Sequence, residues 1–217
     1  MKYLEYDEKL SQCFSGVIMD TLDKMNRRVQ CMHPTVRPLV PSMRMWGETV
    51  TARFGAVAEV PQRPYRLELQ IVDSLREGQV LVSHCDSKDL SAAWGGLLTT
   101  AARSRRATGV VTDGGVRDYV EIVELEFPTF CTGLTPYDSL GRMDVQETNV
   151  PIRCGGIEVR PGDLIFADVD GIVVVPQELA GEVINKAWEK VKGEGKVRDA
   201  LRSGASVTET FEKYGIL

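Results

Sequence analysis

A chain of 217 residues with 43% hydrophobic and 26% charged residues can bury a sizeable core and has the composition of an ordinary globular protein. Its net charge of −5 argues against a nucleic-acid-binding surface, because phosphate contacts need clustered lysine and arginine. No window reaches the roughly 20 apolar residues that cross a bilayer. We therefore expect neither a nucleic-acid partner nor a membrane partner.

The N-terminal part of the chain is predicted to be helical. Apolar residues recur at helical spacing from Asp7 to Met25, which indicates one or two helices within about residues 1–30. Three prolines between residues 34 and 41 end that pattern. A strand rich in β-branched residues is then predicted over 48–57, a helix over 64–75, and a turn followed by a strand over 76–85.

The middle of the chain alternates between helical and strand patterns. We expect a helix from the glycines at 95 and 96 to about residue 106, a strand over 107–113, a short helix over 116–125 and a strand over 128–133. Residues 150–176 read as several short strands with RPGD and DVDG as turns. A long amphipathic helix is predicted over about 177–204, with Gly193 and Gly195 as the points where it could break. This order predicts one mixed α/β domain.

The cysteines and histidines restrict the available chemistry. Five cysteines are an odd number with no C-x-x-C pair, which is typical of reduced thiols, so we expect a cytoplasmic protein. His33 and His84 are the only histidines, too few for a His-rich metal site, and neither lies beside a nucleophile-elbow motif. We expect His84 to be a hydrogen-bonded structural imidazole. The aspartates of RPGD and DVDG suit turns better than a metal cluster.

The stretch VVTDGGVRDYVE places two charges directly after a predicted strand. Gly114 and Gly115 allow a tight turn, which leaves Arg117 and Asp118 at the edge where open α/β sheets bind ligands. Arginine matches a carboxylate, whereas aspartate suits a hard cation such as Mg²⁺. Adjacent side chains point in different directions, so we expect no simple ion pair between the two. A tight turn with solvated charges explains the motif equally well.

A second glycine pair, in AAWGGLLTT, lies at a predicted helix start. Free backbone amides there favour an anion, although close helix packing is the simpler explanation. The strand–helix–strand order of 80–85, 95–106 and 109–113 predicts two parallel strands, so the loops 86–96 and 114–118 should open at the same sheet edge. We therefore expect both motifs to face one cleft, with Trp94 as a candidate wall.

Three segments together resemble the RraA-like family, over the range from about Gly16 to Arg198. The segments are WGGLLTTAARSRRATGVVTDGGVRDYVEI, FPTFCTGLTP and VPIRCGGIEVRPGDLIFADVDGIVVVP. The most specific part is the spacing G-x20-R-D-x2-E, which Gly96, Arg117, Asp118 and Glu121 satisfy. The family includes the class II 4-hydroxy-4-methyl-2-oxoglutarate aldolases and the regulator of ribonuclease E activity, and many members carry the mistaken description of demethylmenaquinone methyltransferase.

The resemblance implies a fold, an assembly and an activity. The fold would be a swivelling-type α/β/β/α sandwich in a single domain of residues 1–217, assembled as a homotrimer or homohexamer. The activity would be that of a divalent-metal-dependent carbon–carbon lyase acting on a small 2-oxo acid. It would catalyse aldol cleavage or oxaloacetate decarboxylation through a pyruvate enolate. The alternative within the family is a non-catalytic regulator that binds a ribonuclease.

The resemblance also implies roles for individual residues. Arg117 would hold the carboxylate and carbonyl oxygen of the pyruvyl group, and Asp118 would be the direct protein ligand of Mg²⁺ or Mn²⁺. Glu121 would help to orient them, and Glu194 of a neighbouring subunit would reach the metal through water. The remaining substrate contacts would be backbone amides of Gly95, Gly96, Leu97 and Leu98.

Two features of the sequence bear on this assignment. The aldolases of the family often carry an acidic residue at the position of Gly96, so its absence leaves the preferred substrate open. Asp118, which the ribonuclease-regulating members need not keep, favours an enzyme. A lysine aldolase is a poor alternative, because Lys88 alone lies near the expected cleft, in the polar DSKD loop.

Overall fold

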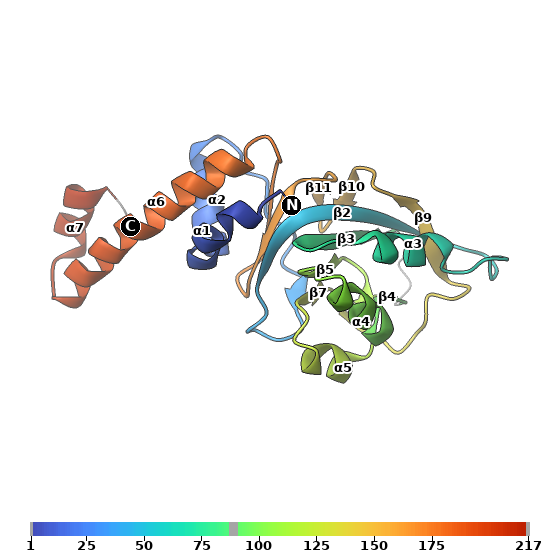
Figure 1. The fold of residues 1–217 in the computed structure, drawn as a ribbon. Coiled ribbons are helices and arrows are strands. Elements are labelled where there is room, and N and C mark those ends of the chain that lie inside the picture. Colours follow the sequence, from blue (N-terminus) through green and yellow to red (C-terminus); the bar gives the residue numbers. More distant parts are fainter. Residues whose placement is uncertain (1, 87–90, 216–217) are drawn as a thin grey trace.

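A curved sheet organises the structure, a computed structural model that describes residues 2–86 and 91–215. The long strand β2 (Met45–Ala56) spans the sheet and bends over the rest of it (Figure 1). The strand order is β1-β7-β5-β3-β2-β12-β13, and β9 pairs with the far end of β2. The other strands of this sheet are β1 (Arg37–Pro38), β3 (Gln79–Cys85), β5 (Gly109–Thr112), β7 (Thr129–Cys131), β9 (Met143–Thr148), β12 (Leu164–Ala167) and β13 (Ile172–Val175).

Four neighbouring strands of this sheet are parallel. β2 pairs with β3, β3 with β5, and β5 with β7, all in parallel register, which confirms the predicted parallel pair around residues 80–85 and 109–113. Helices α3 (Arg66–Ser74), α4 (Gly96–Ser104) and α5 (Tyr119–Glu124) connect these strands. All three helices lie on one side of the sheet in Figure 1, where their apolar faces share a core with Val50, Leu81 and Val110. The parallel strands therefore deliver the loops before α4 and α5 to one edge.

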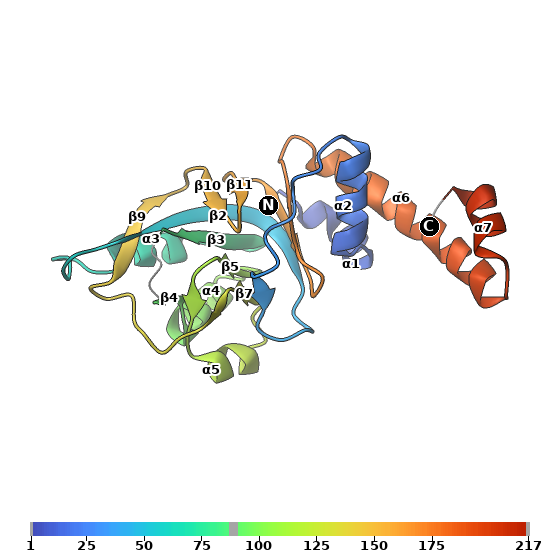
Figure 2. The ribbon, with the colours of Figure 1, turned by 180° about the vertical axis from the view of Figure 1, so that it is seen from behind.

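The other side of the sheet is covered by a hairpin of β10 (Ile152–Cys154) and β11 (Ile157–Val159), which lies beside β2 and β3 in Figure 2. A separate hydrophobic core lies at the far end of the sheet. There, α1 (Asp7–Gln12) and α2 (Ser15–Lys24) pack with α6 (Ala180–Arg202) around Phe166 and Val173. A short 3₁₀ turn at Leu4–Tyr6 precedes α1. The N-terminal region thus contains two helices, within the range predicted.

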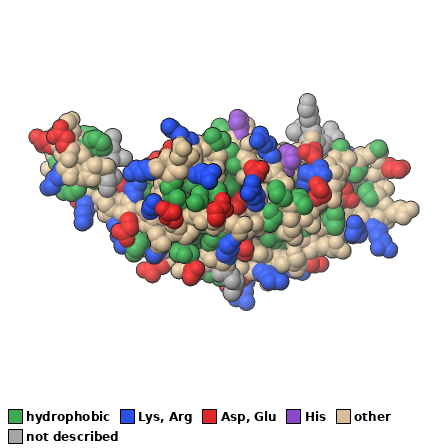
Figure 3. Space-filling view, turned by 90° about the horizontal axis from the view of Figure 1, so that it is seen from above, with side chains coloured by type: hydrophobic (Ala, Val, Ile, Leu, Met, Phe, Trp, Pro, Cys, Tyr) green, Lys and Arg blue, Asp and Glu red, His purple; other side chains and the backbone are tan. Residues whose placement is uncertain are grey.

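The C-terminal helices form an arm. α6 runs away from the sheet and α7 (Val207–Tyr214) folds back against its end (Figure 1). Seen from above, the arm ends in a knob at one end of an elongated molecule (Figure 3). In the described parts of the chain, no helix combines the length and apolarity needed to cross a membrane.

The structure corrects several expectations from the sequence. α6 continues through Gly193 and Gly195, although each glycine costs roughly 1 kcal/mol in a helix; i,i+4 ion pairs such as Lys186–Glu182 and Arg198–Glu194 offset a part of that cost. α7 and β9 were not predicted. Nor were the short strands β4 (Ala92–Trp94), β6 (Gly115–Val116) and β8 (Gly133–Leu134), which form a separate parallel sheet in the order β4-β6-β8.

Candidate active site

The small sheet β4-β6-β8 brings the two glycine-containing motifs together. Trp94 pairs with Val116, and the Arg117 amide donates to the Trp94 carbonyl oxygen at 3.1 Å. Strands β4 and β6 run in the same direction and end at the same edge of the small sheet. The pair Gly95–Gly96 therefore lies directly beside Arg117 and Asp118, at the starts of α4 and α5. This placement confirms that both motifs face one cleft.

Asp118 bridges the two motifs. Its backbone has a φ of 61°, and its Oδ2 atom accepts the Gly96 amide at 3.0 Å. The same oxygen lies 3.7 Å from Nε of Arg117, so the expectation that these neighbours would not pair was wrong. The left-handed backbone turns the carboxylate back toward the guanidinium. The Gly96 amide is consequently taken by Asp118, whereas the amides of Leu97 and Leu98 lie in the first turn of α4 and have no partner within that helix.

Acidic side chains approach both glycines closely. A Cβ atom at Gly95 would lie 2.8 Å from Asp118 Oδ2 and 3.3 Å from Arg117 Cγ. A Cβ atom at Gly96 would lie 2.1 Å from Oε2 of Glu121, an exposed residue of α5. Glu121 therefore occupies the space beside Gly96. In this chain, a carboxylate from α5 stands where a side chain at position 96 would otherwise lie.

A pocket of about 250 Å³ opens over these residues. Its apolar wall includes Trp94, as expected, and Leu69, Leu97 and Leu98. Its polar residues are Tyr65, Glu68, Arg117, Asp118, Asp138 and Ser139. A pocket of this size accommodates a small acid and offers it one guanidinium and the start of a helix, both of which favour an anion.

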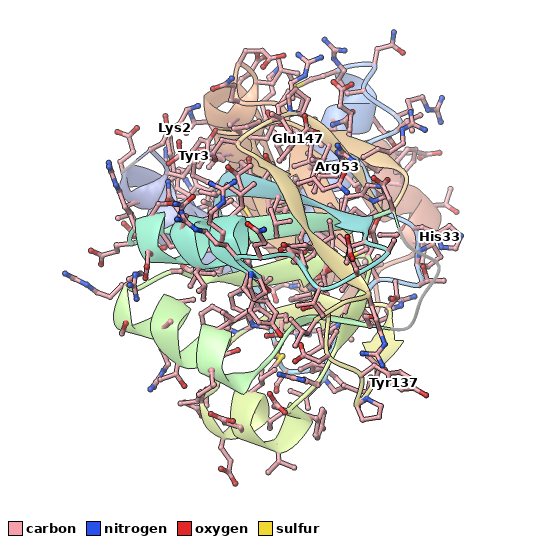
Figure 4. All side chains as sticks on the ribbon, turned by 90° about the vertical axis from the view of Figure 1, so that its right-hand side faces the viewer. Lys2, Tyr3, His33, Arg53, Tyr137 and Glu147 are labelled. Atoms are coloured by element: carbon pink, nitrogen blue, oxygen red, sulfur yellow. The ribbon has the colours of Figure 1, made fainter. Side chains whose placement is uncertain are left out.

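Asp138 is a second carboxylate beside Arg117, and Tyr65 holds Asp138 in place. Arg117 Nη1 lies 3.6 Å from Asp138 Oδ1, and the Tyr65 hydroxyl donates to Asp138 Oδ2 at 3.0 Å. Burial opposes ionisation of Asp138, but the Tyr65 hydrogen bond and the Arg117 charge together lower its pKa below the usual range. Burial and the bond to Asp138 raise the pKa of Tyr65 to about 12, so it remains a neutral donor. Figure 4 shows the neighbouring Tyr137 at the edge of the molecule, where the loop carrying Asp138 runs.

Glu68 is the most perturbed carboxyl group in the pocket. It lies in the first turn of α3, on the same face as Ile71 and Val72, and is only 7% exposed. Burial, followed by the charges of Asp144 and Asp138, raises its pKa to about 8 against the opposing effect of Arg117. A rise of this size favours the neutral form by about 5 kcal/mol. This exceeds the roughly 0.3–1 kcal/mol by which a helix N-terminus favours an anion.

The donor set fits a weakly held, water-rich divalent cation. The described residues contain no group of three histidine, cysteine, aspartate or glutamate side chains able to enclose a metal. Asp118 nevertheless keeps its Oδ1 atom outside the bonds to Gly96 and Arg117, and its side chain is 42% exposed at the pocket. A single carboxylate with several waters and a chelating substrate is a coordination that Mg²⁺ accepts.

Glu194 does not reach this pocket within its own chain. It lies on α6 in the arm, away from α4 and α5 (Figure 1), and pairs loosely with Lys190 at 3.8 Å and Arg198 at 3.9 Å. Its assignment to the pocket of a neighbouring subunit stays a prediction.

The other candidates have structural roles. His84 bonds to Asp113 at 2.7 Å and Asp86 at 2.9 Å, in a surface network that continues through Arg53 to Glu147 (Figure 4). Asp163 and Asp168 accept backbone amides at turns, as expected. Lys88 lies outside the described residues, and no lysine is among the described residues that line the pocket.

Sequence reasoning missed Tyr65, Glu68 and Asp138. The signal for Glu68 was available: in RLELQIVDSL it stands three and four residues before Ile71 and Val72, so a carboxyl group occupies the buried stripe of a helix. Nothing local distinguishes Asp138, which belongs to an irregular loop about 20 residues after Arg117 in the chain.

Comparisons with known proteins agree with this fold. The chain is 28% identical to Protein DlpA of Legionella pneumophila over 95% of its own length, but it spans only 33% of the length of DlpA. It is 31% identical to a putative 4-hydroxy-4-methyl-2-oxoglutarate aldolase of Halalkalibacterium halodurans, over 80% of this chain and 77% of that protein.

A solved structure and a family model complete the comparison. The structure is Streptomyces coelicolor RraAS2, described as an unusual member of the RNase ES inhibitor RraA protein family. It superposes with a TM-score of 0.79 at 26% identity, covering 90% of this chain and 97% of that one. The model of the RraA-like family, described as Aldolase/RraA, matches residues 16–174, which include the curved sheet except for the last residue of β13, and the whole pocket. The chain therefore belongs to the RraA-like family, as its motifs suggested.

Proposed function

We propose that the protein is a divalent-metal-dependent carbon–carbon lyase that releases pyruvate from a small 2-oxo acid, by aldol cleavage or by decarboxylation of oxaloacetate. The observation that carries this proposal is the arrangement of Arg117 and Asp118 against the start of α4 in a pocket of about 250 Å³. Relatives described as 4-hydroxy-4-methyl-2-oxoglutarate aldolases support the same reaction class.

The residues of this chain bind and orient the substrate. Arg117, held between Asp118 and Asp138, offers its guanidinium to the substrate carboxylate and the adjacent carbonyl oxygen. The amides of Leu97 and Leu98 face the same anion from the helix start. Negative charge that develops on the carbonyl oxygen during carbon–carbon cleavage is stabilised by this fixed cation.

Asp118 would hold the Mg²⁺ or Mn²⁺ ion, with water and substrate as the other ligands. The ion supplies a Lewis acid that stabilises the enolate. Trp94, which is only 3% exposed, forms a dry apolar wall on one side of the pocket and so strengthens the electrostatic interactions beside it. Glu121, which lies beside Gly96, would orient the solvent around Asp118.

The competing function is a regulator that binds a ribonuclease and has no chemistry of its own. It is favoured by the structural similarity to an RNase ES inhibitor-family protein. A regulator, however, does not need a pocket in which a guanidinium, a helix start and several carboxyl groups converge. We therefore place it second.

A panel assay tests the proposal against its rival. Purified protein is incubated with Mg²⁺ or Mn²⁺ and a series of 2-oxo acids, and released pyruvate is measured through lactate dehydrogenase. Pyruvate release from oxaloacetate or a 4-hydroxy-2-oxo acid is expected. No turnover of any substrate, together with binding of a ribonuclease in a pull-down, would instead identify a regulator.

A further inference from the structure

The pocket holds three carboxyl groups in different environments. Asp118 and Asp138 flank Arg117 at 3.7 and 3.6 Å and are about 40% exposed, which suits carboxylates that balance a guanidinium. Glu68 also lines the pocket but is buried, and among the described residues its carboxyl group has no hydrogen-bond or ion-pair partner. The oxygens of Glu68 are not among the buried side-chain atoms that lack a hydrogen-bond partner, so the carboxyl group is in contact with the open space of the pocket and not with the packed core.

The surroundings of Glu68 keep it protonated. Burial is the main cause of the rise in its pKa to about 8. The charges of Asp144 on β9 and Asp138 in the loop after β8 add to it, whereas Arg117 acts against them. Two further titratable groups are neutral neighbours, the Tyr65 hydroxyl and the thiol of Cys85 on β3, whose pKa values rise to about 12 mainly through burial. The pocket thus contains a neutral acid, Glu68, beside an ionised carboxylate, Asp138, an arrangement that separates acid and base roles.

Pyruvyl lyase chemistry needs such an acid. Carbon–carbon cleavage leaves a pyruvate enolate, and the reaction ends only when its terminal carbon gains a proton. Asp138, whose pKa is lowered by the Tyr65 hydrogen bond and the Arg117 charge, has no proton to give at neutral pH. We propose that Glu68 is the acid that transfers a proton to the methyl carbon of the enolate, an inference that rests on the proposed lyase function.

The step balances without any further reactant. In oxaloacetate, the C3–C4 bond breaks, CO₂ leaves, and the bonding electrons pass into the enolate. The O–H bond of Glu68 then breaks and its proton goes to C3. The carbon–carbon double-bond electrons form the new C–H bond, and the C2 carbonyl group is restored. Glu68 remains as a carboxylate, which water reprotonates. In the reverse direction, this carboxylate removes a methyl proton from pyruvate.

The reversibility of this step provides the test. Exchange of pyruvate methyl hydrogens for solvent deuterium is followed by NMR with the Mg²⁺-loaded protein, and oxaloacetate consumption is measured in parallel. The variants are Glu68→Gln, which keeps the shape but cannot donate a proton to carbon, and Glu68→Asp, which keeps an acid. Glu124→Gln, at an exposed position of α5, is the matched control.

We expect Glu68→Gln to slow methyl exchange by about 10²–10⁴-fold. Oxaloacetate consumption should fall far less, because cleavage does not use the Glu68 proton and a released enolate is protonated in water. Glu68→Asp should retain part of the exchange, and Glu124→Gln all of it. The wild-type exchange rate should also follow an ionisation near pH 8 that is missing in Glu68→Gln.

Three outcomes would overturn the inference. If Glu68→Gln exchanges protons as fast as wild type, or if both reactions fall by the same factor, Glu68 is not the proton donor, whereas the lyase function stands. If the exchange rate of the wild-type protein shows no dependence on an ionisation near pH 8, Glu68 is likewise not the proton donor, and no variant is needed to show it. If wild-type protein neither consumes oxaloacetate nor exchanges pyruvate hydrogens, the proposed function itself fails.

Discussion

At position 118, one carboxylate is placed to serve both as a structural hydrogen-bond acceptor and as a metal ligand. Asp118→Asn keeps an oxygen that can accept the Gly96 amide, whereas Asp118→Ala removes it. We expect both variants to lose about 10²–10³ in rate, because both lose the anionic ligand. Only the alanine variant should also lose about 1 kcal/mol of stability. Thermal unfolding and pyruvate release measured side by side check this. An asparagine variant with full activity would show that Asp118 is purely structural.

Arg117 is expected to act through its planar fork as well as its charge. Arg117→Ala should raise KM and lower kcat together, since the guanidinium contacts the substrate before and during cleavage. Arg117→Lys should recover only a small part of the loss, because an ammonium group cannot form the paired bonds to carboxylate and carbonyl oxygen. Steady-state kinetics with oxaloacetate measure both parameters. If Arg117→Lys had the kcat and KM of the wild type, Arg117 would not make a bidentate contact with the substrate.

The burial of Glu68 should appear in the pH dependence of stability. Its pKa is about 8 in the folded protein and about 4.5 when unfolded, so the folded state retains the proton between these values. Stability is therefore lost as pH rises from about 4.5 to 8, by up to about 5 kcal/mol. Glu68→Gln should gain stability over wild type as the pH rises from 6 to 9, measured by denaturant unfolding. An equal gain at both pH values would mean that Glu68 is not protonated in the fold.

At the scale of elements, the two adjacent glycines at the start of α4 have different neighbours. A methyl group at Gly95 would displace Asp118 and Arg117, whereas one at Gly96 meets only the flexible end of Glu121. We expect Gly95→Ala to lower kcat/KM by about 10²-fold, because a misplacement of about 1 Å has an effect of this size. Gly96→Ala should have a smaller effect that equals that of Glu121→Ala and does not add to it. If the effects of the two substitutions on kcat/KM add, Gly96 does not act through its contact with Glu121.

The sequence predicted those helices and strands whose apolar residues recur at a clear helical or strand spacing. The strands around 80–85 and 109–113 and the helix between them follow from β-branched runs and helical spacing, and their parallel order places both motifs at one edge. Strands β4, β6 and β8, of two or three residues, are too short to show a period, yet they set the contact between Gly96 and Asp118. Asp138 and Glu68 lie near Arg117 only because of tertiary packing. The sequence therefore predicted Arg117 and Asp118 as pocket residues, but not the carboxyl groups that act on Arg117 from other elements.

At the scale of the whole molecule, the arm formed by α6 and α7 carries Glu194 away from the pocket of its own chain. We propose a trimer or hexamer in which Glu194 of one chain serves the pocket of another. Co-expressing Asp118→Ala and Glu194→Ala chains should yield mixed oligomers in which about a quarter of the sites keep both residues. Each variant alone should be inactive, and the mixture should recover activity in proportion. A mixture as inactive as its parents, or a Glu194→Ala protein with full activity, would contradict the shared site.

The central claim is that the Arg117–Asp118 pocket releases pyruvate with the help of a divalent cation. The most direct measurement is pyruvate release from oxaloacetate before and after treatment with EDTA, followed by addition of Mg²⁺ or Mn²⁺ to wild-type and Asp118→Asn protein. The account predicts that EDTA abolishes the activity, that either ion restores it in the wild-type protein, and that neither ion restores it in the variant. Full activity after EDTA treatment, or full restoration in Asp118→Asn, would contradict it.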